Sequence, residues 1–208
     1  MLAAVAITGT GIISPLGNRA STVWRNWLNK YNAIEVLSEA WSTTLKTKLV
    51  SRCKHVPIEL EPHELSRLDR CTQLAIAAAQ QAWDECGKPE IDPQRIGVVM
   101  SSGIGGLETL YNGTVELEQK SILRINPNTL PMAMPNSAAG LISIMLNASG
   151  DISAPNSACA GGAEAIAIAA QWVNEGHVDI AIAGGCEALI NKLGVCAFEA
   201  LGALSPDS

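Results

Sequence analysis

Hydrophobic residues along this chain occur in two patterns, short continuous runs and longer stretches with helical spacing. Continuous apolar runs cover residues 3–8, 96–100 and 179–183, and such runs are typical of strands buried on both faces. Apolar residues spaced three or four apart cover residues 64–86, 107–123 and 137–146, which predicts amphipathic helices. Alternating strands and helices predict an α/β fold whose mostly parallel sheet is covered on both sides.

The N-terminal run is predicted to be a buried strand that ends in the tight turn Gly9-Thr-Gly11. A dinucleotide-binding fingerprint would place its third glycine at position 14, which is Ser14 and is followed by Pro15, so no nucleotide site is predicted. A short helix is expected to begin at Ser21 as its cap, with Trp24 and Trp27 as core anchors.

Residues 152–162 carry the chemistry that the sequence makes most visible. An apolar, strand-like segment leads to Cys159, and the next dozen residues are rich in Ala and Ile, so the cysteine is predicted to lie where a strand runs into a helix. The first N–H groups of a helix are unpaired and favour negative charge, so the Cys159 thiolate should form more readily there. The Cys159 amide could also donate to a developing oxyanion. The alternative is that Cys159 is a small core residue.

The composition of the chain excludes some classes of binding partner. The chain has 208 residues, of which 48% are hydrophobic, and a formal net charge of −6 without a Lys/Arg cluster. These features indicate one substantial domain and no binding to nucleic acid or to a membrane. The N-terminus lacks the features of a signal peptide, so we expect a cytoplasmic protein. Six scattered cysteines without a Cys-x-x-Cys pair indicate neither a metal site nor a disulfide framework.

Several motifs, in order along the chain, resemble those of the β-ketoacyl-[acyl carrier protein] synthases, most closely the elongating enzymes of types I and II. The motifs are Thr8-Gly-Thr-Gly-Ile-Ile-Ser-Pro-Leu-Gly-Asn18, Ser102-Gly-Ile-Gly-Gly106, Ser157-Ala-Cys-Ala-Gly161, Ala183-Gly-Gly-Cys-Glu187 and the segment 196–205. The resemblance implies the N-terminal half of a thiolase-like fold, a layered α/β arrangement with a mixed, mostly parallel sheet. It implies one synthase domain over residues 1–208.

The resemblance also implies a reaction. Cys159 would be the nucleophile that accepts an acyl group from acyl carrier protein as a thioester. Malonyl carrier protein would then lose carbon dioxide, and the resulting carbanion would attack that thioester to give a 3-oxoacyl product in fatty acid or polyketide synthesis. No cofactor is implied. The implied partners are acyl carrier protein and a second chain, in a homodimer or a ketosynthase heterodimer.

The resemblance covers only about the first half of a family member. Two histidines, a lysine and a gating phenylalanine of the C-terminal half assist the family's reaction, and that half is absent from this chain. His55, His63 and His177 fall in none of the family's catalytic motifs. Three alternatives stay open: the sequence is truncated, a second polypeptide supplies the missing half, or the product is inactive.

By position, eight residues resemble the lining of the family's acyl pocket, and each could equally be ordinary core. They are Gly103, Ile104, Ala158, Leu189, Gly194 and Phe198, with Thr129 and Leu130 expected to reach across the dimer. Leu189 stands where some members have a smaller residue, which predicts a shortened tunnel for short or medium acyl chains. Gly161 stands where many members have Ser or Thr. Pro155 lies in the strand that feeds the nucleophile, where the family's dimers pair.

Three functional hypotheses follow. The first is an acyltransferase that condenses acyl and malonyl thioesters. The second is a non-catalytic partner subunit that resembles the chain-length factors, and the third is a fragment without an independent role. Chain-length factors lack the nucleophile, so Cys159 favours the enzyme.

Overall fold

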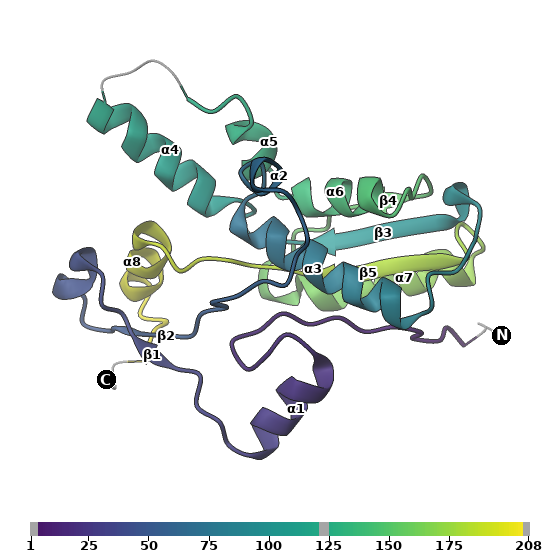
Figure 1. Cartoon of the computed structure of the whole chain (residues 1–208), viewed down its shortest axis with the longest axis horizontal. Coiled ribbons are helices and arrows are strands. Elements are labelled where there is room, and N and C mark those ends of the chain that lie inside the picture. Colours follow the sequence, from purple (N-terminus) through teal and green to yellow (C-terminus); the bar gives the residue numbers. More distant parts are fainter. Residues whose placement is uncertain (1–3, 121–124, 206–208) are drawn as a thin grey trace.

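A computed structural model describes residues 4–120 and 125–205 and shows helices packed on both faces of a parallel sheet (Figure 1). The sheet has the order β4-β3-β5, with β3 (Ile96–Ser101) between β4 (Ile152–Ser153) and β5 (Ile180–Gly185). Val98 of β3 is in register with Ile152 on one side and with Ile182 on the other. Every residue of β3 is buried, which explains its continuous apolar sequence.

The chain contains eight α-helices within the described residues. They are α1 (Ala20–Leu28), α2 (Pro62–Leu65), α3 (Arg70–Glu85), α4 (Leu107–Lys120), α5 (Thr129–Ala133), α6 (Ser137–Met145), α7 (Gly161–Asn174) and α8 (Lys192–Ala200). The short 3-10 helices η1 (Ala40–Thr44), η2 (Pro93–Arg95) and η3 (Ala158–Ala160) complete the helical elements.

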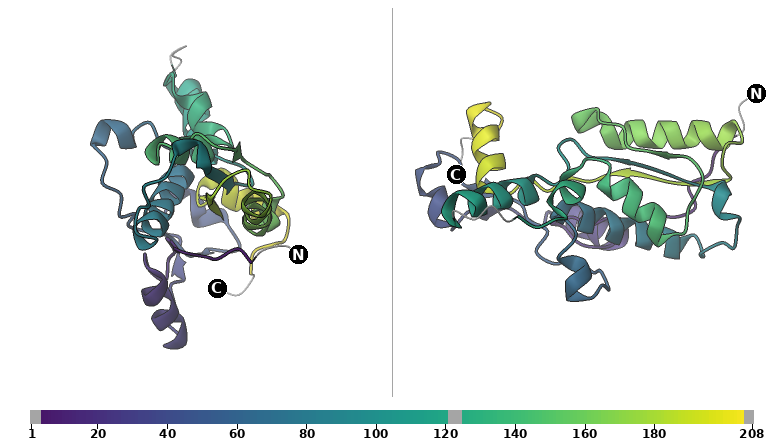
Figure 2. Two further views of the ribbon diagram at one scale, coloured as in Figure 1. Left: turned by 90° about the vertical axis from the view of Figure 1, so that its right-hand side faces the viewer. Right: turned by 90° about the horizontal axis from the view of Figure 1, so that it is seen from above.

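The sheet separates two apolar layers, as the right-hand view of Figure 2 shows, with α7 on one side and α3 and α6 on the other. Val98 faces the layer of α3 and α6, where it packs with buried residues such as Ile76 and Ile142. Val99 faces the opposite layer and packs with Ala165 and Ala169 of α7. The alternation of neighbouring β3 side chains therefore joins both helical layers to one strand.

An antiparallel ribbon lies outside this sheet. Strand β1 (Glu35–Val36) pairs with β2 (Leu49–Val50). The ribbon region packs against α8 through a small cluster formed by Leu37, Leu45 and Val195. The parallel and antiparallel pairings thus belong to two separate sheets among the described residues.

The structure confirms the predicted strands at residues 96–100 and 179–183, which are β3 and β5, and the helix that follows Cys159, which is α7. A strand, helix and strand around Cys159 would be expected to pair β4 directly with β5 in parallel, but β3 lies between them and they are not neighbours. The helix predicted over residues 64–86 is divided. Helix α3 begins after Asp69, whose side chain accepts a hydrogen bond from Cys71 N, and α2 precedes it.

Two N-terminal predictions are wrong. Residues 4–8 form no strand and Ile7 is 81% exposed. This segment instead runs along α3, close enough that a Cβ on Gly9 would lie 2.1 Å from the Ala82 carbonyl oxygen. Helix α1 begins at Ala20 without a side-chain cap. Its Trp24 and Trp27 are more than half exposed and pack on each other with ring centroids 5.1 Å apart.

Candidate functional site

Cys159 lies in η3, between β4 and the start of α7, and its side chain is exposed. The position agrees with the predicted junction of strand and helix. Helix α7 has no side-chain cap at its N-terminus, so its first N–H groups have no capping partner from a side chain. The exposed sulfur therefore stands beside backbone donors, an arrangement that suits a nucleophile and its oxyanion.

The residue before Cys159 has an unusual backbone conformation. Ala158 has φ = +51°, in the left-handed region that costs an L-residue about 1–2 kcal/mol. Such a conformation persists only where the surroundings hold it. Ala158 therefore acts as a bend that turns the chain between Ser157 and Cys159 and presents the sulfur at the surface.

Gly161 brings the start of α7 against the end of β3. A Cβ on Gly161 would lie 1.9 Å from Ser101 Oγ and 2.8 Å from Ser101 Cβ, and Ser101 is only 1% exposed. The Ser101 side chain thus occupies the space that a side chain at position 161 would need. Glycine at position 161 therefore lets α7 start directly against the end of β3.

The carboxyl ends of the three parallel strands position the predicted site residues. Gly103 and Ile104 follow β3, Ala158 follows β4 and Leu189 follows β5. A Cβ on Gly103 would lie 3.7 Å from Ala158 Cα, so the structure brings these two predicted residues together. Parallel strands end at the same edge of a sheet, which is where α/β proteins place their sites.

The remaining predicted lining residues lie on helices. Gly194, in α8, approaches Leu189 so closely that a Cβ on the glycine would lie 2.2 Å from the Leu189 carbonyl oxygen. Phe198 of α8 is 37% exposed and Leu130 of α5 is 71% exposed, whereas Thr129 is buried. Their role as acyl-pocket lining stays a prediction.

Sequence reasoning gave no role to Glu187 and Ser102, which the structure places beside the turn that carries Cys159. Glu187 Oε2 accepts a hydrogen bond from Gly103 N at 2.9 Å, and Ser102 Oγ donates to Glu187 Oε1 at 3.4 Å. Removal from water raises the pKa of the Glu187 carboxyl, while backbone N–H donors, that of Gly103 foremost, act in the opposite direction. A lone glutamate two residues after the end of an apolar strand was the available signal.

The histidine that follows α7 lies at the other end of the sheet. His177 Nδ1 is 3.1 Å from Asp151 Oδ2 and its Nε2 is 3.4 Å from Glu175 Oε2. Asp151 precedes β4 and His177 precedes β5, so both residues lie at the amino ends of strands whose carboxyl ends carry the site. His177 therefore lies at the opposite end of the sheet from Cys159.

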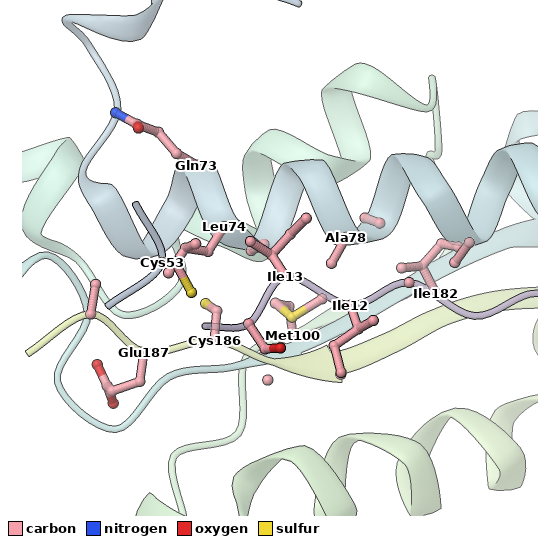
Figure 3. A pocket seen from close by; sticks show the side chains of 18 of the residues that line it. Ile12, Ile13, Cys53, Gln73, Leu74, Ala78, Met100, Ile182, Cys186 and Glu187 are labelled. Atoms are coloured by element: carbon pink, nitrogen blue, oxygen red, sulfur yellow. The ribbon is translucent and has the colours of Figure 1, made fainter. Parts of the chain in front are cut away.

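An open cavity of about 1820 Å³ runs along β5 between that strand, α3 and the extended residues 4–15. Figure 3 shows Ile12, Ile13, Met100 and Ile182 around it, with Glu187 at one end. Cys159 lies outside its lining. The cavity therefore borders the candidate site at Glu187 and Leu189 and extends away from Cys159.

Two cysteines that face this cavity are poor candidates for a nucleophile. A hydrogen bond with Cys71, followed by burial, raises the pKa of the Cys186 thiol, and burial raises that of Cys53. A raised thiol pKa lowers the fraction of reactive thiolate at neutral pH. Cys159 is by contrast the one cysteine classed as exposed among the described residues.

Within the described ranges, no group of three or more His, Cys, Asp or Glu residues is arranged to hold a metal ion. No helix in the same part of the chain has the length and apolar character needed to cross a bilayer.

Comparison with known protein families identifies one matching family over nearly the whole chain. Residues 3–208 match the family described as "Beta-ketoacyl synthase, N-terminal domain". The chain is 38% identical over 205 residues to 3-oxoacyl-[acyl-carrier-protein] synthase 2 of Staphylococcus aureus (strain COL), covering 97% of this chain and 50% of that protein. It is 35% identical over 213 residues to the synthase of the same name from Rhizobium meliloti (strain 1021), covering 97% of this chain and 51% of that protein.

Solved structures show the same fold. A β-ketoacyl synthase from Burkholderia phymatum STM815 superposes with a TM-score of 0.83 at 25% identity, over 97% of this chain and 50% of that one. A type II polyketide ketosynthase, solved in complex with its acyl-carrier protein, superposes with a TM-score of 0.81 at 24% identity, with the same coverage. The chain spans about half the length of the curated relatives that it matches.

Proposed function

The chain belongs to the β-ketoacyl synthase family and matches its N-terminal domain, and from this premise we propose that residues 1–208 form the nucleophile-bearing domain of a 3-oxoacyl-[acyl carrier protein] synthase. The proposed enzyme is an acyltransferase that condenses an acyl thioester with malonyl-[acyl carrier protein] in fatty acid or polyketide synthesis. The observation that carries the proposal is the exposed Cys159 beside the uncapped start of α7.

Cys159 performs the first half of the proposed reaction. Its thiolate attacks the carbonyl carbon of an acyl group on acyl carrier protein, a bond forms between that carbon and Cys159 Sγ, and the bond to the carrier's sulfur breaks. The carrier thiolate leaves and takes up a proton. In the second half, the carbanion formed when malonyl carrier protein loses carbon dioxide attacks the thioester, and Cys159 departs as a thiolate.

The small residues around Cys159 leave room for a thioester. Gly103 and Ala158 lie close to each other beside the turn, and neither has a side chain larger than a methyl group. We propose that these two residues, with Ile104, Leu189, Gly194 and Phe198, line the acyl site, and that Thr129 and Leu130 contribute from a partner chain. Leu189 would shorten the tunnel and favour short or medium acyl chains.

The proposed partners are acyl carrier protein and a second copy or homologue of this chain. Strand β4 lies at the edge of the sheet and Ile152 in it is 47% exposed. An edge strand can pair with another chain, which supports a dimer contact there. Sedimentation of the native chain and of an Ile152→Arg variant tests this contact, and equal masses for the two would contradict it.

Acylation of Cys159 is the direct test of the function. The native chain is incubated with acyl carrier protein thioesters of several chain lengths, and the acylated peptide is identified by mass spectrometry. We expect labelling at Cys159, its loss in Cys159→Ala, and retention in the matched control Cys86→Ala. Preferential loading of long acyl groups would contradict the shortened tunnel.

The same experiment separates the enzyme from the alternatives. A chain-length-factor-like subunit or an inactive fragment would stay unlabelled at Cys159 while remaining folded by circular dichroism. Labelling that is equal in native chain and Cys159→Ala would place the reactive thiol elsewhere and refute the proposed nucleophile.

A further inference from the structure

One carboxylate joins the end of β3 to the end of β5. Glu187 follows β5, and its Oε2 accepts from Gly103 N at 2.9 Å. Its Oε1 accepts from Ser102 Oγ at 3.4 Å, and the same hydroxyl accepts a hydrogen bond from Gly105 N at 2.9 Å. The loop of residues 102–105 is thus tied, directly or through Ser102, to a single side chain 84 positions away from Gly103.

This loop lies against the turn that presents the nucleophile. A Cβ on Gly103 would meet two neighbours, Glu187 Oε2 at 2.8 Å and Ala158 Cα at 3.7 Å. Gly103 is therefore held between the carboxylate and the residue with φ = +51° that precedes Cys159. An alanine in the left-handed backbone conformation depends on its surroundings to stay there. A movement of the loop would therefore change the conformation of the turn at Ala158.

A side chain at position 103 would compete with Glu187 for space. Any side chain at position 103 would displace the carboxylate, since a Cβ there lies 2.8 Å from Glu187 Oε2. The other end of the loop is equally confined, because Gly105 has φ = +75° and a Cβ there would lie 2.6 Å from the Ala133 carbonyl oxygen. The loop has little freedom of its own, and Glu187 sets the position of its first half.

We propose that Glu187 is a positioning residue, which holds residues 102–105 against the Ala158 turn. It thereby fixes the position of the loop that a thioester passes to reach Cys159. This role rests on the proposed function of Cys159. Glu187 acts through Gly103 and Ser102 and does not itself touch the reacting atoms. This role requires the carboxylate oxygens of Glu187 as hydrogen-bond acceptors.

The test compares Glu187→Ala, Glu187→Gln and the matched control Glu175→Ala, whose carboxylate lies at the opposite end of the sheet. For each chain we measure the rate of Cys159 acylation as a function of thioester concentration and the rate of alkylation by iodoacetamide. We expect Glu187→Ala to lower the acylation efficiency about tenfold, mainly through a higher half-saturating concentration, because hydrogen bonds to a charged group are lost. Alkylation by the small reagent should change less than about threefold.

The glutamine variant keeps an acceptor oxygen for Gly103 N, so it should recover most of the acylation that Glu187→Ala loses, and Glu175→Ala should match the native chain. Unchanged acylation in Glu187→Ala would overturn the proposal, and so would a loss in Glu187→Gln as large as that in Glu187→Ala. A fall of acylation and alkylation by the same factor in both variants would also overturn it.

Hydrogen exchange gives a second measurement that is independent of the proposed reaction. Glu187→Ala should speed exchange of the amides in residues 102–105 and also in residues 157–161, whereas Glu187→Gln should do so less. Faster exchange in the first segment only would refute the coupling to the nucleophile turn. If the native chain is not acylated at Cys159 but this exchange pattern is found, the proposed function fails while the positioning role of Glu187 stands.

Discussion

Replacing Gly161 with alanine should destabilise the fold, whereas the same change at the adjacent Gly162 should not. Helix propensity alone predicts that alanine stabilises both positions, by up to about 1 kcal/mol each. The surroundings differ, however. A Cβ on Gly162 would meet only backbone atoms of Gly185 at 3.7 Å and 3.9 Å, whereas a Cβ on Gly161 would lie 1.9 Å from Ser101 Oγ.

The size of the effect follows from these distances. To reach an ordinary contact near about 3.5 Å, Ser101 Oγ would have to move by roughly 1.6 Å and Ser101 Cβ, at 2.8 Å, by roughly 0.7 Å. Rotation of the hydroxyl relieves only the first overlap, and Ser101 is 1% exposed, so β3 and α7 must separate. Overpacking of this kind costs about 1–3 kcal/mol. After the gain in propensity, we expect Gly161→Ala to lose about 1–2 kcal/mol.

Thermal and urea unfolding followed by circular dichroism measure this loss. For a chain of this length it corresponds to a decrease in Tm of about 2–8 °C, and Gly162→Ala should show no decrease. The Ser101→Gly change removes both clashing atoms, so adding it to Gly161→Ala should recover about 1 kcal/mol or more in a double-mutant cycle. A Gly161→Ala chain as stable as the native one, or a cycle without coupling, would refute the reasoning.

Three further predictions concern the rest of the structure. Burial, followed by the charge of Asp69, raises the pKa of Glu108. The native chain therefore loses stability as the pH rises from the pKa of Glu108 in the unfolded chain to its raised pKa in the folded chain. In urea unfolding, Glu108→Gln should be more stable than the native chain at about pH 8 and should have no advantage near about pH 4. Asp69 is 2% exposed, and its carboxylate accepts hydrogen bonds from Cys71 N, Thr109 N and Thr109 Oγ1. Asp69→Ala should therefore lower the free energy of unfolding by about 2–4 kcal/mol in the same measurement, and Asp69→Asn by distinctly less. An Asp69→Ala chain as stable as the native one would show that these hydrogen bonds contribute little. Gly140 lies inside α6, and a Cβ there would have nothing within 4 Å. Gly140→Ala should therefore raise the free energy of unfolding by about 0.5–1 kcal/mol, and a decrease would show that the space is occupied.

The elements that sequence reasoning found are those that local pattern determines. Strand β3 is buried along its whole length and its apolar run shows this directly, while the position of Cys159 before α7 follows from the change of spacing around it. Both predictions depend on residues close together in the chain. The family resemblance rested on the same short motifs and was confirmed.

The failures concern relations between distant segments. A strand at residues 4–8 needs a neighbouring strand to pair with, and the apolar sequence does not show whether one is present. Trp24 and Trp27 lie on one side of an amphipathic helix, but the pattern does not say what covers that side, and both are exposed. Glu187 was missed for the same reason, since its partners Ser102 and Gly103 are 85 and 84 positions away.

The outer edge of β5 has a consequence for handling this polypeptide. β5 ends the sheet and reads Ile-Ala-Ile-Ala-Gly-Gly, without the charged residues, prolines or bulges by which natural proteins blunt such edges. Residues of β5 line the open cavity next to residues 4–15. The free backbone groups along this edge could form hydrogen bonds with an extended segment of another chain. In concentrated solution the 208-residue chain should therefore self-associate through this edge, and a lysine in place of Ile180, which lines the cavity, should keep it dispersed.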